Sequence, residues 1–278
     1  MLAISPAIGP AISGMFAPDF SSILTIDAQA AAFFAVLTGP KLWLDPSFAS
    51  TRFQNVAGST LVTADGQPFA RLNDRSGAGN HVGVSLAQSM PLWKTDGTLS
   101  WAQPDGVDDF WQSLANFDLS STSQATVIAG VRKTSDATMG IICEHGPTFG
   151  NVGTLALRGP TGSGTDNFGA VMNTGTIREA YSAAAISPFS AVLAGIFDGA
   201  ADPSSKMLVN GVQTSSAAGA SGSGKFISGL LNFFRRNGTS FPFSGRLYGL
   251  MIIGRLLTAS ELSLCQRWMA SKSGVTLA

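Results

Sequence analysis

The chain of 278 residues is poor in charge, because only 12% of its residues are charged whereas 45% are hydrophobic and 32 are glycine. These values exclude a chain kept disordered by excess charge and favour a turn-rich β protein. Lys plus Arg equals Asp plus Glu at 17 each. The sequence therefore offers no basic surface for nucleic acid, which needs clustered cations against its phosphates.

Residues 1–40 form an arm rich in Ala, Ile, Phe, Pro and Gly. No basic residue precedes Lys41, and Pro6 and Pro10 interrupt the apolar start, so we expect no secretory signal. No uninterrupted apolar run approaches the ~20 residues of a membrane helix, so we expect no insertion into a membrane. The charged fraction is about half that of a lone soluble domain, which indicates that copies of the chain or other proteins cover part of its surface.

A short helix is expected within the arm. Asp27 precedes the Ala-rich segment AQAAAFFAVL, and Gly39-Pro40 follows it, which predicts a helix with Asp27 as its N-terminal cap. The helix must bury its apolar face, either on the chain's own sandwich or on a partner subunit or larger particle. We expect residues 1 to about 25 to anchor the protein and the helix behind them to pack on the sandwich.

From Lys41 to about Gly254, short apolar runs are separated by clusters of Gly, Asn, Asp and Ser, which is typical of a β-sandwich. The expected strands are residues 126–133, 140–146, 153–159, 167–173, 190–199, 206–216 and 243–254. Asn210-Gly211 predicts a tight hairpin turn, because both of its positions favour positive φ. Residues 217–224, AAGASGSG, are expected to form a flexible loop without packed side chains.

A second helix is predicted at the end of the chain. Thr258 and Glu261 stand three residues apart as a capping box, and Gly274 marks the expected end of the helix. Its apolar face follows at helical spacing and comprises Leu262, Cys265, Trp268 and Met269. Cys265 and Cys143, the two cysteines, lack the spacing of a zinc or redox site and are expected to be reduced and buried.

Five motifs follow one another in a recognisable order. They are WLDP at 43–46, GSTLVTADGQPFARLNDRSGAGNH at 58–81, PDGVDDF at 104–110, LVNG at 208–211 and FSGRLYGLMIIGRLLTASE at 243–261. Together they resemble the concanavalin-A-like, laminin-G-like domains of bacteriophage virion proteins. The fold class that the strand pattern and this resemblance indicate is all-β: an antiparallel two-sheet jelly-roll sandwich at residues 41–278, with the apolar arm at 1–40 and a short C-terminal helix.

The resemblance also implies a function and a location. It suggests a structural protein of a phage virion, assembled in the host cytoplasm and carried on the tail, fibre, baseplate or capsid. Its partners would be other virion proteins and copies of itself, and its lectin-like sandwich would bind the host surface or a glycan on it. A free carbohydrate-binding module is the alternative, and a glycan hydrolase is a third hypothesis.

Catalysis is not expected from the residues present. Sandwiches that cleave glycans need two facing carboxylates, but the chain has only three glutamates: Glu144 without an acid at i+2, Glu179 in a polar turn region, and Glu261 in the capping box. Cys143 and His145 share one face of a strand while Glu144 takes the other, so a Cys-His-Glu set does not form.

Two kinds of residue are candidates for ligand contact. Trp93 and Trp101 flank the turn at Asp96-Gly97 and are expected to be the tryptophans exposed enough to stack on sugar rings. Asn80 and Asp108 lie in two polar loops that are candidates to contact the same ligand.

The same loops are rich in oxygen ligands, so Ca²⁺ is the one candidate cofactor that the sequence indicates. Its candidate ligands are Asp74, Asn80, Asp108 and Asp109. The alternative, turns that satisfy their own hydrogen bonds, is favoured because no Ca²⁺ loop of fixed spacing is present.

Overall fold

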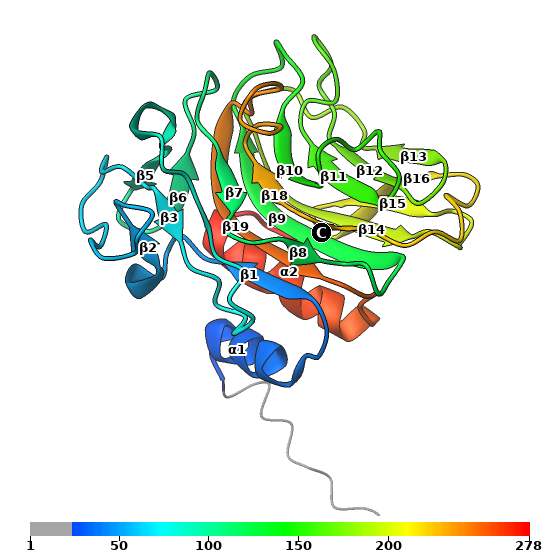
Figure 1. The fold of residues 1–278 in the computed structure, drawn as a ribbon, viewed down its shortest axis with the longest axis horizontal. Helices are drawn as coiled ribbons and strands as arrows, with labels where there is room; N and C mark the ends of the chain where they lie inside the picture. Colours follow the sequence, from blue (N-terminus) through cyan, green and yellow to red (C-terminus); the bar gives the residue numbers. More distant parts are fainter. Residues whose placement is uncertain (1–23) are drawn as a thin grey trace, which may run out of the picture.

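An eight-stranded antiparallel sheet forms the middle layer of the computed structural model, which describes residues 24–278 (Figure 1). Its strands in spatial order are β16 (Val212–Ala217), β15 (Ser205–Val209), β14 (Phe189–Asp198), β9 (Gln124–Lys133), β19 (Gly245–Ile253), β6 (Ser100–Gln103) and β5 (Leu92–Thr95), while β1 (Lys41–Leu44) also pairs with β19. The central strands are apolar on both faces, as expected of strands that are covered from both sides.

A nine-stranded antiparallel sheet packs against one face of the first. Its strands in order are β13 (Ile177–Tyr181), β12 (Gly169–Asn173), β11 (Thr154–Arg158), β10 (Ile141–His145), β18 (Leu231–Phe233), β7 (Trp111–Ser113), β4 (Val82–Gly83), β3 (Arg71–Leu72) and β2 (Arg52–Phe53). A separate pair joins β8 (Phe117–Asp118) to β17 (Ser228–Gly229). The facing side chains of the two large sheets form one core, which includes Val127 from β9 and Leu157 from β11.

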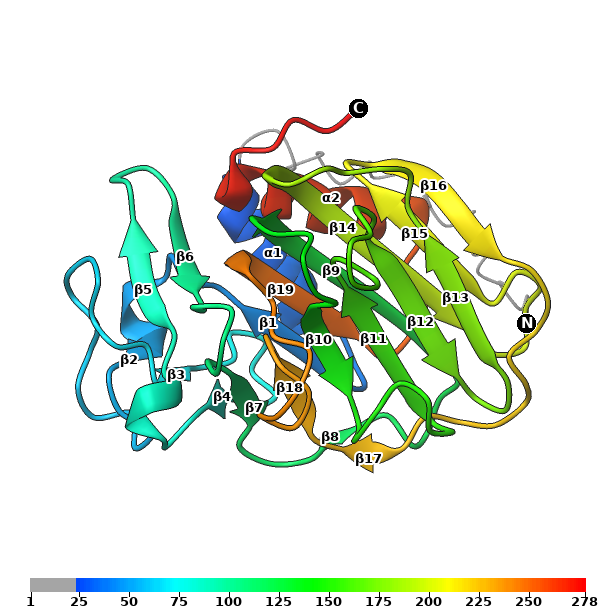
Figure 2. The same ribbon diagram turned by 90° about the horizontal axis from the view of Figure 1, so that it is seen from above.

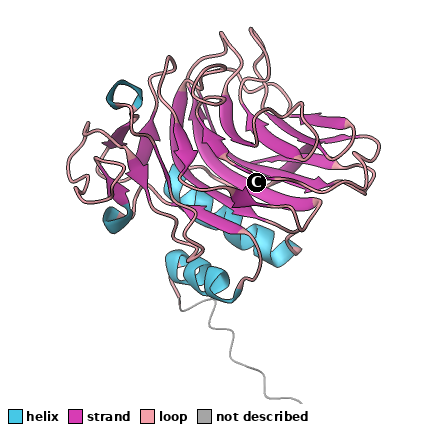
Figure 3. Ribbon diagram, viewed as in Figure 1, coloured by secondary structure: helices cyan, strands magenta, loops and turns pink. Residues whose placement is uncertain are grey.

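Two α-helices cover the other face of the eight-stranded sheet (Figure 3). They are α1 (Ile26–Val36) and α2 (Ala259–Ser273), and two 3₁₀ turns occur at Ala49–Thr51 and Ala87–Ser89. The Phe34 ring stacks on Trp43 of β1 with centroids 4.9 Å apart, and Trp268 of α2 meets Trp43 edge-on at 5.3 Å. No α-helix among residues 24–278 has the length and apolar character needed to cross a membrane.

The C-terminal helix follows the sequence pattern closely. The Thr258 side chain accepts a hydrogen bond from the Glu261 backbone N–H, and the Glu261 carboxylate accepts one from the Thr258 N–H. The helix ends at Gly274, whose φ of 67° is the left-handed conformation that glycine adopts readily. The capping box and the predicted end are both confirmed.

The first helix begins at a different cap from the one predicted. Thr25, and not Asp27, is the N-cap, because its hydroxyl accepts the hydrogen bond from the Ala28 N–H. Asp27 lies in the first turn, where its carboxylate accepts hydrogen bonds from Trp268 Nε1 at 2.7 Å and from Lys272 Nζ at 3.0 Å. The helix therefore packs on the chain itself, as expected, whereas the proposed anchor at residues 1 to about 25 lies almost entirely outside the described residues.

Every strand expected from an apolar run is present, with ends within two residues of those predicted. The hairpin at Asn210-Gly211 is confirmed by φ angles of 53° and 89°. The expected strands omitted β1 to β8, β17 and β18. They also omitted β13, an edge strand whose residues IREAY include the charged Arg178 and Glu179. Glu179 lies in this strand, so its expected place in a turn is wrong.

The segment 217–224 is packed, contrary to the prediction of a loop without packed side chains. Ala217 ends β16 and Ser221 is only 2% exposed. The Ser221 hydroxyl donates to the Thr176 carbonyl at 2.6 Å and accepts from the Thr174 N–H at 2.8 Å. Small residues are needed here because this segment lies directly against the β12–β13 turn.

Both cysteines are free and buried, as predicted. Burial raises the pKa of each thiol to about 12, so both stay protonated at neutral pH.

The aromatic contact of α1 yields a test of how the helix is held. Phe34→Ala is expected to lower the free energy of unfolding by about 3–5 kcal/mol, because the ring is 1% exposed and stacked on Trp43. Val36→Ala, on the same helix but 79% exposed, is the control and should change it by less than about 0.5 kcal/mol. Urea denaturation measures both, and equal effects would show that α1 is not part of the packed structure.

Candidate functional site

The outer face of the nine-stranded sheet is the one face of the two large sheets that, among residues 24–278, neither an α-helix nor the other sheet covers. In Figure 2 strands β10–β13 lie in front, and both helices lie behind them. Side chains alternate along each strand, so Cys143 of β10 faces the core while Glu144 takes the outer face. Strand register places Glu144 in one row with Gln112, Asn232, Ala156, Val171 and Glu179.

A buried ion pair, Glu144–Arg236, lies at the centre of this face. Glu144 is 0% exposed, and Arg236 binds it with Nε 3.0 Å from Oε2 and Nη2 2.9 Å from Oε1. The Phe149 N–H donates a third hydrogen bond at 2.6 Å. Burial raises the pKa of Glu144, although Arg236 opposes this rise. Asn237 Nδ2 donates to the Pro147 carbonyl, so the loops that carry Arg236 and Phe149 are joined above the sheet.

A second ion pair lies next to the first. Arg158 Nη2 is 3.1 Å from Glu179, and the Arg158 side chain is 4% exposed. The Phe149 ring contacts both guanidinium groups, 4.3 Å from Arg158 and 4.5 Å from Arg236. Burial lowers the pKa of Arg158. These contacts fix the charged side chains in place and leave little of them exposed.

A pocket of about 240 Å³ lies on the same face, over β4 and β7. Gly83 pairs with Gln112 across these strands, and the close approach of another strand requires a glycine there. A Cβ at Gly83 would lie 2.7 Å from the Ala70 carbonyl oxygen and 3.4 Å from Val56 Cγ2. The lining residues are Val56, Gly83, Val84, Ser85, Leu86, Phe110, Gln112, Ser113 and Leu114. Such an apolar hollow with a few polar groups is typical of a site for a small ligand or part of one.

The two tryptophans expected at the ligand site are buried, so the prediction that they are exposed is wrong. Trp93 is 5% exposed, its Nε1 donates to the Pro46 carbonyl, and Arg52 lies over its ring at 3.9 Å. Trp101 is 4% exposed, and Arg246 covers it at 4.2 Å. Flanking a turn suggested exposure, but neighbouring arginine side chains cover both rings.

The loop that holds Asp74 and Asn80 satisfies its own polar groups. Asp74 accepts hydrogen bonds from the backbone N–H groups of Trp43, Ser76 and Asn80, and a further one from the Ser76 hydroxyl. Asn80 Nδ2 donates to the Lys41 carbonyl at 2.9 Å. These bonds tie the loop to β1.

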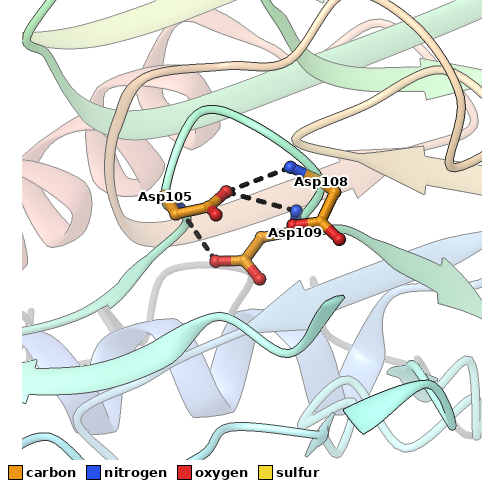
Figure 4. A group of neighbouring side chains, drawn as sticks. All are labelled: Asp105, Asp108 and Asp109. Atoms are coloured by element: carbon orange, nitrogen blue, oxygen red, sulfur yellow. Dashed lines mark hydrogen bonds between the residues drawn. The ribbon is translucent and has the colours of Figure 1, made fainter. Parts of the chain in front are cut away.

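The Asp105–Asp109 loop gathers three carboxylates, as Figure 4 shows. Oxygens of Asp105, Asp108 and Asp109 lie within 4.8 Å of one another, and Asp74 is not part of this group. One Asp105 oxygen accepts hydrogen bonds from the N–H groups of Val107, Asp108 and Asp109, and Asp109 accepts one from the Asp105 N–H. The structure thus brings Asp108 and Asp109 together in a hydrogen-bonded turn. Burial raises the pKa of Asp109 to about 6, and the neighbouring carboxylates add to this effect.

The two histidines and Glu261 are engaged in structural contacts. His145 is 0% exposed and its Nε2 lies 3.0 Å from the Phe117 carbonyl oxygen. His81 Nδ1 accepts the Asp74 N–H. Glu261 binds Arg255 at 2.7 Å, which lowers its pKa to about 2. Desolvation by burial lowers the pKa of both histidines.

The pocket was not predicted, and none of its residues was a candidate for ligand contact, although Phe110 ends the motif PDGVDDF. Gly83 lies in the short run HVGV, and Gln112 lies in WQS, 29 residues further on. Neither run has a motif. The glycine inside a strand-like run is the one available signal, because such a glycine indicates a bulge or a close approach of another group.

The raised pKa of Asp109 predicts a dependence of stability on pH. The folded-state value of about 6 lies above the ordinary 3.8, so the folded protein loses stability from this group as the pH rises from 4 to 6. Asp109→Asn removes this loss, and the variant should melt at a higher temperature than the wild type at pH 7.5 but not at pH 4.

Asp118→Asn provides the control of opposite sign. Hydrogen bonds from Ser120 lower the pKa of Asp118, so its loss should destabilise the protein at pH 7.5 and not at low pH. A difference between Asp109→Asn and wild type that is the same at every pH would contradict the assignment.

No known protein-family profile matches the chain, and no curated protein does. The receptor-binding domain of botulinum neurotoxin type G has a TM-score of 0.53 at 12% identity, covering 83% of this chain and 51% of its own. The binding domain of botulinum neurotoxin DC, in complex with rat synaptotagmin II, has a TM-score of 0.52 at 9% identity over 80% and 51%. The chain thus spans about half the length of both toxin domains.

A third solved structure is CBM40 of the Ruminococcus gnavus IT-sialidase, bound to α2,3-sialyllactose. It aligns with a TM-score of 0.41 at 20% identity, over 52% of this chain and 83% of its own. At identities this low, the likeness of the toxin domains concerns the fold alone. The predicted jelly-roll sandwich is confirmed by the two antiparallel sheets and by this likeness.

Proposed function

We propose that the chain is a non-catalytic, lectin-like module that a bacteriophage virion displays, and that it binds a host-surface glycan in the pocket over β4 and β7. The pocket carries the proposal. It is a hollow on the sheet face that no α-helix of the described chain covers, and it combines apolar walls with a few polar groups. Sugar rings present C–H surfaces beside hydroxyl groups, so a lining of this mixed kind suits them.

The shared fold supports a binding role. The two botulinum structures with this fold are named binding domains, one for a receptor and one in complex with synaptotagmin II. The identities of 12% and 9% carry no information about individual residues. The site proposed for this chain therefore rests on its own pocket, and function follows from the site and not from the fold.

The engagement of the acidic residues supports a role without catalysis. A glycan hydrolase needs a free carboxylic acid and a free carboxylate facing each other across the substrate. Glu144, Glu179 and Glu261 are each held by an arginine. The Asp105–Asp109 carboxylates accept hydrogen bonds from their own loop.

The composition supports display on a particle. With 12% charged residues, the chain suits a surface that is partly covered by other copies or other proteins. Residues 1–23 contain several large apolar side chains, whose transfer from water to an apolar interface contributes about 1.5–3 kcal/mol each. The sequence resemblance to virion domains is the reason for proposing that the particle is a phage. A free carbohydrate-binding module, outside any virion, is the alternative.

A glycan array tests the binding role. The wild type should bind a subset of glycans, and Leu114→Asn, which places an amide on a pocket residue that is 45% exposed, should reduce that binding at least tenfold. Leu92→Asn is the matched control, because Leu92 is 42% exposed but lies on β5, away from the pocket lining. Equal binding by the two variants would place the ligand elsewhere, and no binding by any form would refute the glycan role.

A truncated chain that starts at Thr25 tests the anchoring role. It keeps the N-cap of α1, so its melting temperature should stay within a few degrees of the full chain, whereas its incorporation into phage particles should be lost. Full-length Phe34→Ala is the control, since it is destabilised but keeps the anchor. Normal incorporation of the truncated chain would contradict anchoring, and a large fall in melting temperature would show that the arm belongs to the core.

A further inference from the structure

We infer that the pocket over β4 and β7 takes the acetamido group of an N-acetylated amino sugar. The inference rests on the proposed glycan-binding function and names the chemistry of its ligand. It follows from the hydrogen-bonding capacity that the polar residues of the pocket leave unused, and from the apolar side chains beside them.

The hydrogen bonds of Gln112 leave one acceptor in the pocket. Asn232 Nδ2 donates to the Gly146 carbonyl at 3.0 Å, so the Asn232 oxygen is an acceptor and Gln112 Nε2 must donate to it, at 2.8 Å. This fixes the orientation of the Gln112 amide. Its oxygen, Oε1, has no hydrogen-bond partner among the described residues. The Ser113 Oγ accepts the Leu231 N–H at 3.0 Å, which leaves its own O–H as a donor.

A ligand group that satisfies the Gln112 oxygen donates one hydrogen bond, and its neighbouring atoms must suit apolar side chains. Val56, Leu86, Phe110 and Leu114 supply the apolar part of the lining. A plain sugar hydroxyl donates, but it carries no methyl group to place among these side chains. A deoxy-sugar methyl is apolar but donates nothing. An acetamido group has both, an N–H donor and a methyl group on one short planar unit.

The size and rim of the pocket agree with this assignment. A volume of about 240 Å³ is below the ~300–1,000 Å³ of pockets that enclose drug-sized ligands. It suits one substituent and part of one sugar ring. Ser85 is exposed in the lining, so its hydroxyl is available to the acetamido carbonyl.

A series of three sugars separates the two contributions. The methyl glycoside of N-acetylglucosamine has the methyl group and the N–H, its 2-O-acetyl analogue keeps the methyl group but lacks the N–H, and methyl glucoside has neither. With wild-type protein, loss of the N–H should weaken binding about fivefold and loss of the acetyl group a further fourfold or more. The galactosamine series is run in parallel, and NMR titration measures the dissociation constants.

A variant connects the N–H to Gln112. Gln112→Met removes the acceptor at similar volume, so it should bind the N-acetyl and O-acetyl sugars equally. Gln213→Met, on the exposed strand β16, is the control and should keep the fivefold preference. Gln112→Met also leaves the buried Asn232 oxygen without a donor, so its melting temperature is measured alongside. The sugar series on wild-type protein does not depend on that variant folding.

The outcomes distinguish the two proposals. A graded loss along the series, abolished by Gln112→Met, supports the acetamido assignment. Equal affinity for all three sugars, or array binding only to glycans without acetamido groups, overturns the assignment but leaves the glycan-binding function standing. No binding of any sugar or array glycan overturns both.

Discussion

The burial of both faces of the eight-stranded sheet is the constraint on which the rest of the structure depends. Neighbouring residues of β9 show it: Val127 belongs to the core between the sheets, and Ile128 belongs to the core beneath the helices. A sheet that is apolar on both sides needs two covers. The nine-stranded sheet supplies one, and the helices, fixed by the contacts of Phe34 and Trp268 with Trp43, supply the other. Neither cover lies on the outer face of the nine-stranded sheet, which is where we propose that a ligand binds.

The scarcity of charge shapes what that outer face can recognise. The ion pairs Glu144–Arg236 and Arg158–Glu179 are largely buried, and they hold the loops above the centre of the face. Replacing such pairs by apolar residues is often neutral for stability, so their value here is the placement of the loops. The hollow over β4 and β7 lies on the same face. The pocket lining has no charged residue, so the binding that we propose there would depend on shape and on neutral polar groups, and it should respond little to salt.

The sequence alone predicted the helices and strands that depend on residues close together in the chain. Strong apolar runs predicted the central strands, and the Thr258–Glu261 capping box predicted α2, because each pattern is set by neighbours along the chain. The burial of a side chain by residues far away in the sequence was not predictable. Arg52 covers Trp93, and Arg246 covers Trp101. The pocket is of the same kind, since it exists only when β4 pairs with β7 and places Gly83 opposite Gln112. No single-sequence pattern specifies that register.

The three layers place the N-terminal helix and the pocket on opposite sides of the protein. The first described residues lead into α1, on the helical side of the eight-stranded sheet (Figures 1 and 2). The pocket is lined by Gly83 and Gln112, among others, from the other sheet. Asp27 joins α1 to α2 through Trp268 and Lys272, so a chain held by its N-terminus is held through the helical layer. A virion attached at that end would have the pocket facing away from it. In the function that we propose, anchoring and binding would therefore use opposite sides of the sandwich and would not compete for surface.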